Sequence, residues 1–94
     1  MLKVKDGVTP FNLLIAAAAA NVAEQLGITL FITSGTDGKH MVGSRHYIGQ
    51  ALDFRISNLT PHQIALVKEL LANRLGPHYD VILESDHIHA EFNK

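Results

Sequence analysis

Two short stretches of the sequence carry side chains that can bind a metal ion. The first reads GSRHYIGQALDF and contains His46 and, seven positions later, Asp53. The second reads DHIH, close to the C-terminus, and contains His87 and His89. Two imidazoles from among these three histidines, together with one carboxylate, form a ligand set that suits zinc better than magnesium or calcium. With water in the fourth position, such a site would be open for catalysis.

The composition limits what else the chain can do. With 94 residues it suits one domain, residues 1–94, and it contains no cysteine, so any metal ligands must be His, Asp or Glu. The formal net charge is −1 and the charged residues are scattered. We therefore expect no nucleic-acid partner and no polybasic membrane patch.

The apolar run LLIAAAAA, residues 13–20, follows two lysines and has the outline of a signal peptide. However, Asp6 interrupts the basic region, and Thr9-Pro10 is typical of a helix start. The run is also too short to span a membrane. We therefore interpret the run as part of a helix of the domain, which continues to Leu26 and ends at Gly27. On this interpretation the chain has no convincing signal peptide, and the sequence does not indicate a cellular compartment.

A second helix is indicated by local capping signals. Thr60 is the expected N-cap, Pro61 the first helical residue, and Gln63 completes a capping box. The apolar stripe Ile64, Val67, Leu71 and Leu75 faces the core, and Gly76-Pro77 ends the helix.

Alternating side chains predict the strands that would carry the chemistry. In ALDFRI, residues 51–56, we expect Leu52, Phe54 and Ile56 to face the core and Ala51, Asp53 and Arg55 to share the opposite face. Residues 80–84 and 87–92 read as a hairpin, in which His87, His89 and Glu91 share one face.

The expected element order is helix, strand, loop, strand, helix and hairpin. The first strand lies in ITLFITSG, residues 28–35, and the glycine-rich loop SGTDGKHMVGS follows it. Two main helices with a small antiparallel sheet make the expected fold α+β.

The two motifs together resemble those of a known enzyme family. SRHYIGQALD fits the pattern S-x-H-x-x-G-x-A-x-D, and DHIH fits the later [ED]-x-x-H. The chain thereby resembles the M15 family of zinc D-alanyl-D-alanine carboxypeptidases and LAS-type peptidases, which includes endolysins. The resemblance covers about residues 30–92 and implies the hedgehog-like fold of that family.

The resemblance implies a role for each matching residue. His46, Asp53 and His89 would bind one catalytic Zn²⁺. Asp86 falls where the family has its catalytic acid, with Glu84 as a second candidate, and His87 resembles a histidine that acts beside the transition state in some members.

The implied substrate is the stem peptide of peptidoglycan, cut at a D-Ala-D-Ala or an L-Ala-D-Glu type bond by a monomer. Ser44 would order the loop or contact the substrate, and Arg45, Lys39 or His87 would supply an oxyanion donor. Many family members have an arginine soon after the Ser-Gly of the loop, whereas residues 34–40 read SGTDGKH. Lys39 supplies a cation there, but without the bidentate geometry of arginine.

Plainer interpretations of the same residues stay open. His46 could cap a turn, Asp53 could be a polar residue of an exposed strand face, and Asp86 could be a turn former. His87 and His89 could face solvent, and Glu91 could either orient a ligand or be surface charge.

Three functional alternatives follow from these interpretations. One is a non-catalytic zinc-binding domain on the same scaffold, favoured by the missing arginine. Another is a structural module that binds peptidoglycan without cutting it. The third is a metal-free α+β domain.

Overall fold

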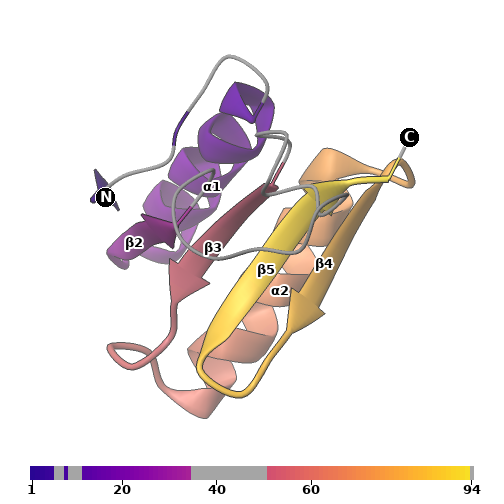
Figure 1. Cartoon of the computed structure of the whole chain (residues 1–94). Coiled ribbons are helices and arrows are strands. Elements are labelled where there is room, and N and C mark those ends of the chain that lie inside the picture. The colour runs from indigo at the N-terminus through magenta and orange to yellow at the C-terminus, as the bar shows by residue number, and fades with distance from the viewer. Residues whose placement is uncertain (6–7, 9–11, 35–50, 94) are drawn as a thin grey trace.

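Two helices lie against one face of a five-stranded mixed sheet (Figure 1) in the computed structural model of the chain, which describes residues 1–5, 8, 12–34 and 51–93. The described part of the chain is therefore an α+β domain, as predicted. In chain order its elements are β1 (Leu2–Val4), α1 (Leu13–Leu26), β2 (Leu30–Ser34), β3 (Ala51–Arg55), α2 (Pro61–Leu75), β4 (Tyr79–Leu83) and β5 (His87–Phe92).

The strands lie in the order β1-β2-β3-β5-β4. The pairs β2–β3, β3–β5 and β5–β4 are antiparallel, as the sequence predicted. The prediction of a purely antiparallel sheet is wrong, because β1 pairs with β2 in parallel. A parallel pair needs a crossover connection, and α1 supplies it. A strand of three residues is too short to show a periodic pattern, so β1 could not be predicted from alternation.

The core lies between the helices and the sheet. Phe54 and Leu52 of β3, with Ile88 and Ala90 of β5, are fully buried against it. Ile56, also predicted to face the core, follows β3 and is half-buried against it. The helices contribute the buried residues Ile15, Ala19, Val22, Ala23, Val67 and Leu71.

Both helices end where local signals predicted. Gly27 has φ 65° in the left-handed region, and its N–H donates to the carbonyls of Ala23 and Glu24. Glycine adopts this conformation without the steric cost that a Cβ atom imposes. α1 begins at Leu13 with Asn12 at the N-cap position; the predicted start, Thr9-Pro10, lies outside the described residues.

α2 begins with the predicted capping box. The Thr60 hydroxyl accepts from the Gln63 N–H at 3.1 Å, and the Thr60 N–H donates to Gln63 Oε1 at 2.9 Å. Gly76 follows the helix, as expected. Neither α1 nor α2 combines the length and the apolar character that a membrane-crossing helix needs.

Candidate metal centre

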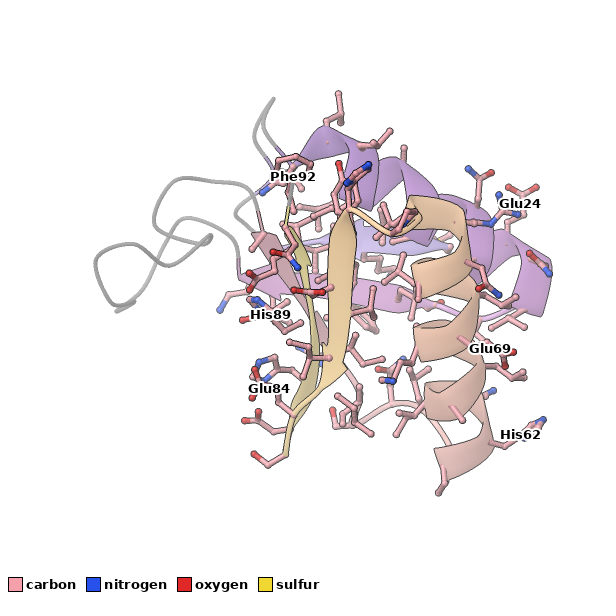
Figure 2. All side chains as sticks on the ribbon, turned by 90° about the vertical axis from the view of Figure 1, so that its right-hand side faces the viewer. Glu24, His62, Glu69, Glu84, His89 and Phe92 are labelled. Atoms are coloured by element: carbon pink, nitrogen blue, oxygen red, sulfur yellow. The ribbon has the colours of Figure 1, made fainter. Side chains whose placement is uncertain are left out.

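The face of the sheet turned away from the helices carries the candidate site. Figure 2 shows His89 and Glu84 on this side, while His62 and Glu69 project from the outer side of α2. We call the surface made by Asp53, Arg55, His87, His89 and Glu91 the open face. It results from alternation, because the neighbours of these residues in β3 and β5 are the core residues described above.

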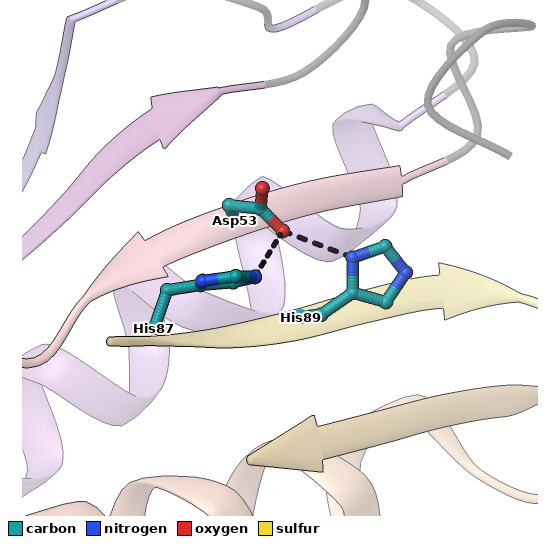
Figure 3. A group of neighbouring side chains, drawn as sticks. All are labelled: Asp53, His87 and His89. Atoms are coloured by element: carbon teal, nitrogen blue, oxygen red, sulfur yellow. Dashed lines mark hydrogen bonds and ion pairs between the residues drawn. The ribbon is translucent and has the colours of Figure 1, made fainter. Parts of the chain in front are cut away.

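The pairing of β3 with β5 brings the metal-binding side chains together. Asp53 lies directly opposite His89, and Arg55 lies opposite His87. Asp53 Oδ1 is 2.9 Å from His89 Nδ1 and 3.5 Å from His87 Nε2 (Figure 3). One potential ligand atom from each of these three residues lies within 4.8 Å of the other two. Asp53, His87 and His89 therefore form a candidate metal site.

Each of the two imidazoles also contacts a further carboxylate through its other ring nitrogen. The second nitrogen of His87, Nδ1, is 2.6 Å from Asp86 Oδ1, and the second nitrogen of His89, Nε2, is 2.6 Å from Glu91 Oε1. Histidines that bind metals usually donate their other N–H to such a partner, which fixes the tautomer and the ring orientation. The donor set of two imidazole nitrogens and one carboxylate oxygen fits a transition-metal ion such as zinc. The second carboxylate at each ring would hold that ring in a fixed orientation.

In the metal-free protein, the same contacts favour a protonated His89. The hydrogen bond with Asp53 is the main cause that raises the pKa of His89, and Glu91 adds to it against the opposing effect of burial. When it is protonated, the His89 ring can donate from both nitrogens, to Asp53 and to Glu91. Since a metal ligand must give up the proton on its binding nitrogen, metal and proton compete for this residue.

A buried asparagine ties α1 to the start of β3. Asn12 is fully buried, and its Nδ2 donates to the carbonyl of Ala51 at 3.1 Å. Ala51 is two residues before Asp53, so this bond holds the strand segment that carries the carboxylate. Sequence reasoning missed Asn12, because its partner is 39 positions away in the chain and such a long-range bond leaves no sequence signal.

Of the predicted zinc ligands, Asp53 and His89 are brought together, and both side chains are largely buried, at 13% and 11% exposed. The third predicted ligand, His46, lies outside the described residues, as do Ser44, Arg45 and Lys39. His87 was predicted to be catalytic, and the structure places one of its nitrogens among the candidate ligand atoms.

The two candidate acids lie on either side of His87. Asp86 is 84% exposed and contacts His87 Nδ1. Glu84 is 48% exposed, and its Oε1 is 3.9 Å from His87 Nε2. Glu91, which the sequence left open between a supporting role and surface charge, contacts His89. The shared face of the three β5 residues was the sequence signal for this arrangement.

No protein-family model matches the chain, and no curated protein sequence matches it either.

Proposed function

We propose that the chain is a zinc-dependent peptidase that hydrolyses peptide bonds in the stem peptides of peptidoglycan. The observation that carries the proposal is the convergence of Asp53, His87 and His89 on the open face, with their ligand atoms within 4.8 Å. The motif that includes His46 ends at Asp53, so the two motifs that suggest the M15 family meet in this group.

His46, Asp53 and His89 would hold the ion, with His87 next to them. The five residue-to-residue steps from His46 to Ala51 can span up to roughly 17 Å, so the chain length permits His46 to reach the group. When bound, zinc would lower the pKa of its water to about 7 and would polarise the scissile carbonyl.

The protein's own proton-transfer groups would be Asp86 and His87. Asp86 would accept the proton of the attacking water and deliver it to the leaving amine. The 2.6 Å contact between Asp86 Oδ1 and His87 Nδ1 supports pairing of the two residues. His87 Nε2 faces Asp53, so the ring connects an exposed carboxylate with the candidate ligands. Glu84 is the second candidate for the acid.

The decisive experiment measures zinc content and reaction products together. Purified protein is loaded with zinc, incubated with intact peptidoglycan fragments with and without a chelator, and the products are identified by mass spectrometry. Loss of a terminal alanine indicates a carboxypeptidase, and release of the stem from the glycan-linked alanine indicates an endopeptidase. We expect one of these products, and we expect the chelator to abolish it.

The matched variant is Asp86→Asn, which keeps the size of the side chain and removes its basicity. It should retain one zinc ion and lose at least about 100-fold in rate, as expected when a general acid–base group is removed. Glu69→Gln, on the outer side of α2, is the control and should behave as wild type. Full activity of Asp86→Asn would exclude this residue and direct attention to Glu84→Gln.

A non-catalytic zinc-binding domain is the second candidate. The absence of arginine from residues 34–40 and the 84% exposure of Asp86 favour it, because a proton-transfer group is usually more enclosed. Bound zinc without any product would support this candidate. Peptidoglycan binding that persists in the chelator would instead indicate a structural wall-binding module.

A further inference from the structure

One cation on the open face is placed to bind a ligand. Arg55 is exposed, lies two residues after Asp53 on the same face of β3, and is directly opposite His87. Its guanidinium makes no ion pair with any carboxylate in residues 1–5, 8, 12–34 and 51–93. Asp86, next to His87 in sequence, and Glu91, at the far end of the same strand face, contact histidine nitrogens.

An aromatic ring holds the guanidinium in place. Arg55 Cζ lies over the ring of Phe31 in β2, 4.6 Å from its centroid. A guanidinium over an aromatic face keeps the N–H donors at its edge available, and these donors match a carboxylate in bidentate geometry. The contact therefore orders the side chain without using its hydrogen-bonding capacity.

On this part of the sheet the two cationic groups lie toward β1 and β2, and the carboxylates lie toward β3 and β5. Lys3 of β1 is exposed and pairs in register with Phe31, so a second cation lies beside the ring that holds Arg55. The carboxylates Asp53, Glu84, Asp86 and Glu91 lie around the two histidines. A peptide crossing the face would therefore be oriented with its anionic group toward Arg55.

We infer that Arg55 binds a free carboxylate of the peptide substrate, next to the candidate metal centre. The inference rests on the proposed function for the identity of the peptide. Neighbouring strands are about 4.7–4.9 Å apart. The Arg55 guanidinium lies over Phe31 of β2, so it is about one or two strand spacings from the candidate metal site on β3 and β5. An extended residue spans about 3.3–3.6 Å. The carboxylate would therefore belong to one of the first few residues beyond the scissile bond, which favours cleavage near a free C-terminus.

The test compares two synthetic stem peptides that end in D-Ala-D-Ala, one with a free C-terminal carboxylate and one with a C-terminal amide. Dissociation constants are measured by calorimetry for the full chain, both zinc-loaded and metal-free. We expect the acid to bind about tenfold or more tightly than the amide, the size expected for a charge-assisted hydrogen-bond pair.

Variants then assign the preference to its source. Arg55→Ala should remove the preference, and Arg55→Lys should keep only part of it, since lysine lacks the bidentate fork. Arg74→Ala, at the end of α2, is the matched control and should keep the full preference. Circular dichroism establishes that each variant is folded.

The outcomes separate this inference from the proposed function. Equal binding of acid and amide, binding of neither, or a preference that persists in Arg55→Ala overturns the role of Arg55. An acid preference that depends on Arg55, in a protein that never hydrolyses either peptide, overturns the peptidase activity and leaves carboxylate binding by Arg55 supported.

Discussion

The two faces of β3 and β5 are built from alternate residues of the same strands, yet different forces organise them. On the covered face, Phe54 lies opposite Ile88 and Leu52 opposite Ala90, and all four are fully buried. On the open face, Asp53 lies opposite His89, and charged groups contact one another at 2.6–3.5 Å.

The difference shows that the covered face determines the geometry of the open one. Burying a large apolar side chain contributes about 1.5–3 kcal/mol, so the covered face strongly favours one strand register. A shift by one residue would expose these side chains and bury the charged ones. The metal-binding groups meet because apolar packing selects the register that places Asp53 opposite His89.

The largest expected effect on stability is that of Ile88→Ala on the covered face, compared with Ile82→Ala on the open side of the sheet. Ile88→Ala should lower the free energy of unfolding by about 2–5 kcal/mol, because the fully buried side chain leaves a cavity. Ile82 in β4 lies opposite His89 and is 45% exposed, so Ile82→Ala should cost less than about 1 kcal/mol. Urea denaturation measures both, and equal losses would contradict the assignment of the faces.

The next effect concerns Asn12, the polar link on the covered side. Asn12→Ala leaves the Ala51 carbonyl without this donor and should cost about 1–3 kcal/mol in urea denaturation. Asn21→Ala is the control, because Asn21 is exposed and its Nδ2 donates to the Ala17 carbonyl of the same helix. A loss no larger than that of the control would show that the link to β3 is unimportant.

On the open face, Glu91→Gln should weaken zinc binding about 10–100-fold, because the carboxylate orients His89 through Nε2. Zinc affinity is measured by competition with a chromophoric chelator. Glu69→Gln again serves as the control. Unchanged affinity in Glu91→Gln would mean that Glu91 is only surface charge.

The smallest expected effect is the change in stability with pH, because titration of His89 alters its charge and removes no side chain. Because the folded protein raises the pKa of His89 above 6.5, the stability from its two carboxylate contacts is fully present below that pH. It is lost as the pH rises through the raised pKa. In the presence of a chelator, the stability difference between wild type and His89→Gln should shrink as the pH rises above 6.5 through the raised pKa. A difference that is constant or grows over this range would contradict the protonated state.

Much of the domain could be predicted because its signals are local. The capping box at Thr60, the helix end at Gly27 and the alternation in residues 51–55 and 87–92 each depend on neighbouring residues. The same alternation correctly placed Asp53, His87, His89 and Glu91 on faces away from the core.

Only the tertiary structure decided which of these groups meet. The parallel pairing of β1, the bond from Asn12 to Ala51 and the contact of Arg55 with Phe31 each join residues more than 20 positions apart. The sequence by itself determined which residues could share a face, since alternation is a property of one strand. Strand pairing decided that His87 joins Asp53 and His89 and that a carboxylate supports each ring, because these distances depend on register across the sheet.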